Sequence, residues 1–298
     1  MRVLKYKIIT IVISALLASC NEGFNNEVSD NNSNNTVKVV ELSTTLSYSG
    51  NDLGIYSKEF GDLNDCTLRN KITTHRSTDG FEDRLNSYLI AKDDAQINDL
   101  SEVTFGEITY EKTAHDMMEP KFLKQFRANK GVGTKEKVHQ ISKDIFGSEQ
   151  YFLLKGNNYT IEKSQYVPQK ISISKMGRLD KSINTYKTNR DNLSVQYNID
   201  TKNKNGVLLI LMWDGSRQDM NMQQLGSLNM DIKKLIAVFD PNDNGNLQVP
   251  ASALSSFPKN ANITSILMRG NSSIVEKDNK KHYIVTSSEQ YERIIVED

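Results

Sequence analysis

Residues 193–213, LSVQYNIDTKNKNGVLLILMW, decide the fold class of this chain. In residues 193–199 four apolar side chains alternate with three polar ones, and a period of two is the pattern of a strand with one buried face. Residues 202–206, KNKNG, predict a turn, because Asn and Gly accept the backbone angles that turns require. The apolar run at 207–213 predicts a strand buried on both faces, and we expect Trp213, the single tryptophan, to anchor the core.

Similar strand signals continue on both sides of this stretch. Short β-rich segments separated by Asn, Gly and Pro turns lie at 171–174, 235–239, 247–249, 263–268, 282–286 and 291–296. Strands of this number and spacing predict an antiparallel β-sandwich over residues 168–298.

The 168–298 segment resembles the immunoglobulin-like modules found at the C-termini of bacterial envelope lipoproteins. The resemblance rests on the strands predicted at 193–199 and 207–213, on DPNDNG at 240–245 before Val249-Pro250, and on ILMRG at 266–270. It implies a fold and no activity, because such modules have many functions.

Residues 37–167 combine strand and helix signals. Alternating, β-branched segments predict strands at 37–42, 102–110, 151–154 and 159–161. Apolar side chains at helical spacing predict helices at 119–126 and 135–146. We therefore expect a mixed α+β or β-rich domain before the sandwich, in a chain that is mainly β.

The first nineteen residues have the layout of an export signal. Three basic residues precede a ten-residue apolar run at 8–17, which is shorter than the about 20 residues that cross a bilayer as a helix. The run ends in Leu17-Ala18-Ser19-Cys20, which resembles the lipobox of bacterial lipoproteins. The resemblance implies cleavage before Cys20, palmitate-type lipid on that residue and, with Asn21 in place of Asp, delivery to the outer membrane.

Residues 20–36 are rich in Asn and acidic residues and contain few hydrophobes. Such a segment buries too little apolar surface to offset the entropy of ordering, so it predicts a disordered tether. Removal of the first 19 of the 298 residues leaves 279, and the loss of Arg2, Lys5 and Lys7 changes the formal net charge from 0 to −3. This near-neutral charge argues against a nucleic-acid partner.

Two features of the sequence are candidates for a metal site. DPNDNG at 240–245 begins like an EF-hand calcium loop, but the twelfth position, which requires Glu, is Ala251. The flanking strand signals instead predict a hairpin turn at Asn244-Gly245. The four histidines have no metal-ligand spacing in the sequence, so we expect no metal and no cofactor; they are His75, His115, His139 and His282.

The function hypotheses follow from the predicted lipid anchor and from the absence of a recognised catalytic motif in the sequence. With Cys20 lipidated, Cys66 has no partner for an intramolecular disulfide. We expect a lipid-anchored envelope protein with a non-enzymatic binding or scaffold role and a protein or glycan partner. One alternative is a surface adhesion protein that binds glycans with some of its 12 tyrosines. The other is a lipid-anchored hydrolase with a site around Cys66, His75 or His115.

Overall fold

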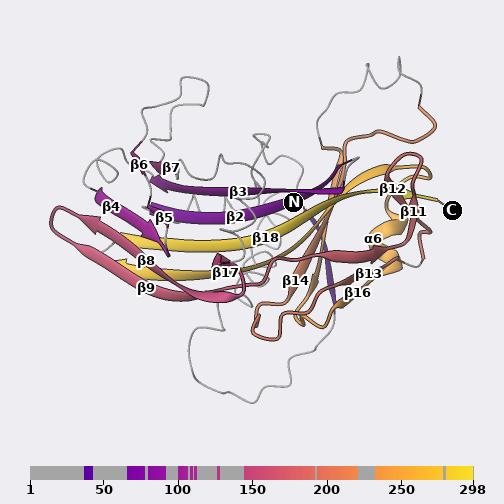
Figure 1. Ribbon diagram of the computed structural model, residues 1–298. Helices are drawn as coiled ribbons and strands as arrows, with labels where there is room; N and C mark the ends of the chain where they lie inside the picture. Colours follow the sequence, from indigo (N-terminus) through magenta and orange to yellow (C-terminus); the bar gives the residue numbers. More distant parts are fainter. Residues whose placement is uncertain are drawn as a thin grey trace, which may run out of the picture.

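The protein is mainly β, as the sequence predicts (Figure 1). The computed structural model describes residues 37–42, 66–77, 80–91, 100–106, 108–109, 111–112, 126–127, 144–191, 193–220, 232–277 and 280–297. These residues form three open sheets of eleven, three and four strands. The predicted signal, the lipobox with Cys20, the tether, His115 and His139 lie outside the described residues.

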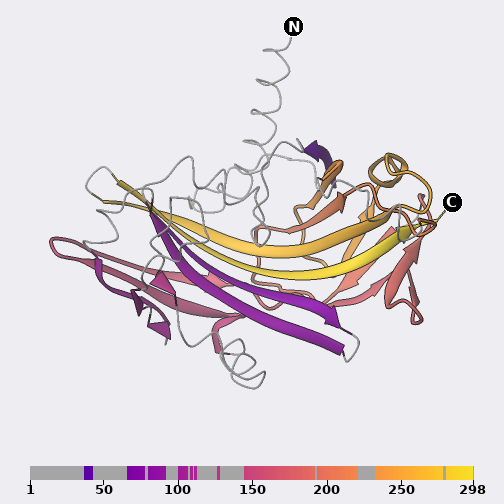
Figure 2. The same ribbon diagram turned by 90° about the horizontal axis from the view of Figure 1, so that it is seen from above.

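The eleven-stranded sheet is the central element. Nine strands form its main path, in the spatial order β1 (Lys38–Leu42), β15 (Lys234–Asp240), β14 (Val207–Trp213), β17 (Asn262–Lys277), β18 (Lys280–Val296), β2 (Cys66–Ser77), β3 (Gly80–Ala91), β7 (Phe126–Arg127) and β6 (Glu111–Lys112). Two further strands lie off this path: β12 (Thr185–Thr188) pairs with β18 and with β11 (Arg178–Asp180). Most neighbours are antiparallel, but β2 and β12 run parallel to β18. Figure 2 shows β17 and β18 as one long curved hairpin, with the shorter β2 and β3 beside it over part of its length.

The strand β14 is buried on both faces, as its unbroken apolar sequence predicts. Leu209 and Leu211 belong to the main hydrophobic core, whereas Ile210 belongs to a second apolar cluster on the opposite face of the sheet. Trp213 is only partly buried at the edge of the main core, and its indole N–H donates to the Ser216 carbonyl oxygen at 2.7 Å.

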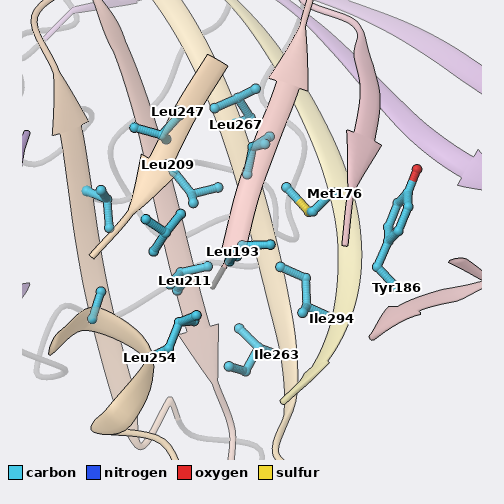
Figure 3. Packing of buried hydrophobic residues seen from close by; sticks show 14 of the residues in the cluster. Met176, Tyr186, Leu193, Leu209, Leu211, Leu247, Leu254, Ile263, Leu267 and Ile294 are labelled. Carbon is cyan, nitrogen blue, oxygen red and sulfur yellow. The ribbon is translucent and has the colours of Figure 1, made fainter. Parts of the chain in front are cut away.

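A three-stranded sheet covers one face of the central sheet. It consists of β10 (Ile173–Met176), β13 (Leu193–Tyr197) and β16 (Asn246–Val249), followed by the short helix α6 (Ala251–Ser255). The inward side chains of β13 and β16 meet those of β14, β15, β17 and β18 in the main core (Figure 3). Leu193, Val195 and Leu247 are fully buried there, so the alternation seen in the sequence marks the inner face.

The third sheet contains β5 (Ile108–Thr109), β4 (Leu100–Phe105), β8 (Ser148–Gly156) and β9 (Thr160–Val167). Its buried residues include Phe105 and Phe152, whose ring centroids lie 4.4 Å apart. The strand β9 contacts β17 and continues toward β10, so the chain passes here from the four-stranded to the three-stranded sheet.

Three local expectations are wrong. The Asn244-Gly245 segment does not close a hairpin, because β15 pairs within the central sheet and β16 pairs with β13. The segments expected as strands at 282–286 and 291–296 are one strand, β18, whose polar middle is buried. Phe126, expected at the end of a helix, lies in β7, where backbone pairing with β3 overrides the local helical pattern.

Candidate functional site

A buried group of charged and tyrosine side chains lies where the three sheets meet. We call Arg269, Asp200, Asp243, Tyr166 and Tyr197 the Arg269 cluster. Arg269 follows Leu267 on the inner face of β17, Tyr166 comes from β9, and the two aspartates come from the loops that leave β13 and β15. The Arg269 side chain is 0% exposed, which makes it one of the largest fully buried side chains in the described part of the chain.

The Arg269 guanidinium bridges both loops. Nη2 donates to the carbonyl oxygen of Asn198, Nε lies 3.3 Å from Asp243 Oδ2, and Nη1 lies 4.0 Å from Asp200 Oδ2. The guanidinium carbon also lies 5.8 Å from the centroid of the Tyr197 ring, in cation–π range. One side chain thus holds the ends of two connections that cross between sheets.

Asp200 is well supplied with donors. The Tyr166 hydroxyl donates to Oδ1 at 2.8 Å, the backbone N–H of Gln169 to Oδ2 at 2.7 Å, and that of Lys202 to Oδ1 at 3.1 Å. Burial, together with this contact to Asp200, raises the pKa of Tyr166. Asp200 therefore ties the chain after β9 to the loop after β13.

Asp243 has fewer partners. The Asn203 amide donates to Oδ2 at 2.9 Å, whereas the buried Oδ1 has no hydrogen-bond partner among the described residues. Burial raises the pKa of Asp243, against the opposing effects of Asn203, Arg269 and the backbone N–H of Asp200. Burial likewise lowers the pKa of Arg269, although Asp243 and Asp200 act in the other direction.

Local turn chemistry explains why the sequence brings these carboxylates together. Asp200 and Asn203 accept backbone N–H groups two residues further on, and so does Asp240 in the second loop. Gly206 has φ +68, and a Cβ at this position would lie 2.1 Å from the Asp240 carbonyl oxygen. The two loops are therefore in close backbone contact, which only glycine permits at position 206.

A second polar seam lies on the same face of β18. The side chains of Ser288 and Gln290 accept the backbone N–H groups of Ile171 and Ile173, each at 2.7 Å. Further along, Glu292 accepts from Gln290 Nε2 at 2.7 Å and from Arg76 Nε at 2.7 Å. These side chains take the place of the backbone acceptors that a neighbouring strand would supply. They fix the chain between β9 and β10 to the central sheet.

Of the residues proposed for a hydrolase site, the two that the structure describes, Cys66 and His75, do not converge. Cys66 and His75 lie at opposite ends of β2, and nine residues of strand separate their backbones by about 30 Å. His282 pairs in register with Cys66 and is buried, with its ring centroid 6.0 Å from that of Tyr159. Among the described residues no group of three or more His, Cys, Asp or Glu side chains has the arrangement of a metal site.

The tyrosines whose side chains the structure describes are mostly buried or partly buried and do not form one exposed aromatic surface. Tyr151 is 45% exposed, but Tyr186 and Tyr197 are buried. The Tyr186 hydroxyl accepts from Arg76 Nη2 at 2.6 Å, and that of Tyr291 donates to Glu289 Oε2 at 3.1 Å. These hydroxyl groups serve internal packing, as is common for half-buried tyrosines.

The loop at 240–245 connects two sheets in place of the predicted hairpin turn. Asp240 binds the backbone of Asn242, and Asp243 faces Arg269. The sequence interpretation did not identify Arg269 as part of a site. The available signal was an arginine within the apolar run at 266–270, because a charge in a buried strand requires buried counter-charges.

Comparison with known proteins gives no family: no family model, curated protein or solved structure matches the chain. Within the described ranges no helix is both long and apolar enough to cross a bilayer.

Proposed function

We propose that this chain is a lipid-anchored protein of the bacterial envelope with a non-enzymatic binding or scaffold role. The anchor is lipid on Cys20, residues 20–36 are the tether, and the β-rich remainder presents a surface to a protein or glycan partner. The observation that carries the scaffold role is the long hairpin of β17 and β18, which joins β14 on one side of the central sheet to β2 on the other.

The hairpin of β17 and β18 gives the protein length and stiffness. The strands contain 16 and 17 residues and remain in register from Asn262–Ile295 to Lys277–Lys280. At about 3.3 Å per residue, each strand extends for about 50 Å. The three-stranded sheet packs on one half of this hairpin, while β9 contacts it near the middle. A continuous paired element of this kind suits a spacer that holds a binding surface away from a membrane.

The buried polar contacts support a structural role for the Arg269 cluster. Its charged groups are 0–1% exposed, and most of their contacts join one segment of the chain to another. Groups that bind or react with a ligand need access to it, whereas groups that position loops do not.

For residues 168–298 we further propose an immunoglobulin-like sandwich that has been extended along two strands. The three-stranded sheet and the facing part of the central sheet enclose one apolar core, which supports this relation. The extension of β17 and β18 beyond that core is the main departure from an isolated sandwich module.

Metabolic labelling with a palmitate analogue tests the anchor. The wild-type chain is expected to carry label, Cys20→Ala to lose it, and Cys66→Ala, the matched change at the other cysteine, to keep it. Equal labelling of the Cys20→Ala variant and the wild type would show that the proposed anchor is wrong.

Protease treatment of intact cells tests which side of the outer membrane the fold occupies. A scaffold inside the envelope is expected to resist cleavage until the outer membrane is opened. Cleavage in intact cells would place the fold at the surface and favour the adhesion alternative over an internal scaffold.

A further inference from the structure

The Arg269 cluster contains more buried negative than positive charge. Its one guanidinium faces two carboxylates, and the side chains of Arg269, Asp200 and Asp243 are 0%, 0% and 1% exposed. An uncompensated buried charge is costly, so such a group tends to bind a proton.

The hydrogen bonds indicate which carboxylate carries the surplus charge. Asp200 accepts from one hydroxyl and two backbone N–H groups, which compensate a negative charge. Asp243 accepts the Asn203 amide on Oδ2, but its Oδ1 is buried without a hydrogen-bond partner among the described residues.

The other titratable and charged groups around Asp243 come from each neighbouring element. Tyr197 of β13 has a buried hydroxyl, and Tyr166 of β9 binds Asp200. Asp240, at the end of β15, is buried and accepts from Asn242. The Lys202 ammonium lies 5.7 Å from the Tyr166 ring centroid, on an exposed residue. Arg269 of β17 is thus the only cation among the described groups that forms an ion pair with Asp243.

We propose that Asp243 is a proton-binding switch at the meeting point of the three sheets, and that the loops after β13 and β15 are held most tightly on β17 when its carboxyl is protonated. The proton neutralises the surplus charge and leaves Asp200 as the counter-ion of Arg269. A metal cation in the proton's place would be repelled by the guanidinium, which lies 3.3 Å from the same carboxylate.

The direction of the pH effect follows from burial. Burial raises the pKa of Asp243 in the folded protein. The stabilisation is then fully present below the ordinary carboxyl pKa of about 3.9, and it is lost as the pH rises through the raised value. One proton corresponds to a change of at most about tenfold in the opening equilibrium per pH unit.

Hydrogen exchange of the full chain, purified in detergent, tests the proposal. We expect protection of the backbone amides in 198–206 and 240–245, corrected for intrinsic exchange, to fall with rising pH by up to about tenfold per unit. Asp243→Asn removes this dependence and makes the loops more protected than in the wild type at pH 8. Asp191→Asn, the same change at an exposed position, keeps the wild-type profile.

Any of four outcomes overturns the proposal. Three concern the Asp243→Asn variant: failure to fold, retention of the wild-type pH profile, or weaker protection than the wild type at pH 8. The fourth is loss of the pH dependence in Asp240→Asn, which would make the neighbouring carboxyl the proton-binding group. The test does not depend on lipidation, so it is independent of the proposed anchor.

Discussion

The strands β17 and β18 pass through two regions that differ in chemistry. In the main core their inner face carries Ile263, Leu267 and Ile294, all of which are fully buried among apolar neighbours. Beside and beyond these residues the same face carries side chains that are equally buried but hydrogen-bonded: Arg269 on β17, and Ser288 and Gln290 on β18. Both sets of side chains come from the same two strands and are buried to a similar degree.

The comparison shows which interactions determine the structure of each region. Apolar packing stabilises in proportion to buried area and tolerates many arrangements. A buried polar group is favourable only when particular partners are in place. The core therefore supplies most of the stability, and the polar region decides which segments meet. The following predictions test this contrast, from the largest expected effect to the smallest.

Arg269→Met should have the largest effect. The change keeps similar bulk but leaves Asp200 and Asp243 without their counter-ion, at an expected cost of about 3–5 kcal/mol in the free energy of unfolding. Urea denaturation of the full chain measures it, with Lys175→Met at an exposed position as the control. A loss below about 1 kcal/mol would mean that the ion cluster adds little to loop attachment.

Leu267→Ala, two residues earlier on the same face, tests the apolar region. Truncation of a fully buried leucine is expected to cost about 2–5 kcal/mol, through lost transfer energy and a residual cavity. The loss should be equal at pH 5 and pH 8, in contrast to that of Arg269→Met. Leu153→Ala, at a half-buried position in β8, should cost less in the same denaturation series.

Gln290→Ala tests the polar seam. It leaves the backbone N–H of Ile173 buried without its acceptor, at an expected cost of about 1–3 kcal/mol. Faster hydrogen exchange at Ile173 should accompany the lower stability, whereas Gln248→Ala, on an exposed face, should change neither. Unchanged exchange at Ile173 would show that β18 does not fix this segment.

Asp180→Asn should have the smallest effect. Hydrogen bonds from Ser182 and Lys187 lower the pKa of Asp180 to about 2. Its contribution is therefore present above the ordinary value of about 3.9 and is lost as the pH falls through about 2. The difference between the thermal melts of variant and wild type should be slight at pH 7 and should shrink as the pH falls to 2, where about half of the Asp180 carboxyl groups are protonated. A difference of unchanged size at pH 2 would indicate lost packing instead of lost charge.

The apolar region was largely predictable from the sequence. The alternation in 193–197 and the apolar run in 207–213 correctly gave a strand with one buried face and a strand with two. Turn residues correctly placed the breaks at 202–206 and 240–245, but turn chemistry does not say which strands pair. The predicted hairpin failed because β15 and β16 belong to different sheets.

The polar region was hidden because its residues look solvent-exposed in the sequence. TSSEQYE at 286–292 suggested a break between two strands, yet six of these seven residues are buried and Tyr291 is partly buried. Ile199, expected to continue the buried alternation, is 52% exposed, since the chain leaves β13 at Tyr197 and turns Asp200 inward. Such burial depends on partners far away in sequence, which a local pattern does not contain.

The parallel pairing of β2 with β18 has a consequence for the order of folding. Cys66 of β2 pairs with His282 of β18, so an early segment waits for nearly the last one before it gains its neighbour. Closing so long a loop is slow, because its entropy cost comes before any contact forms. During synthesis β2 and β3 therefore stay apart from the rest of the central sheet until residues 280–296 have emerged. A chain that is cut short before β18 lacks the element that joins β2 to β17, so its central sheet stays divided.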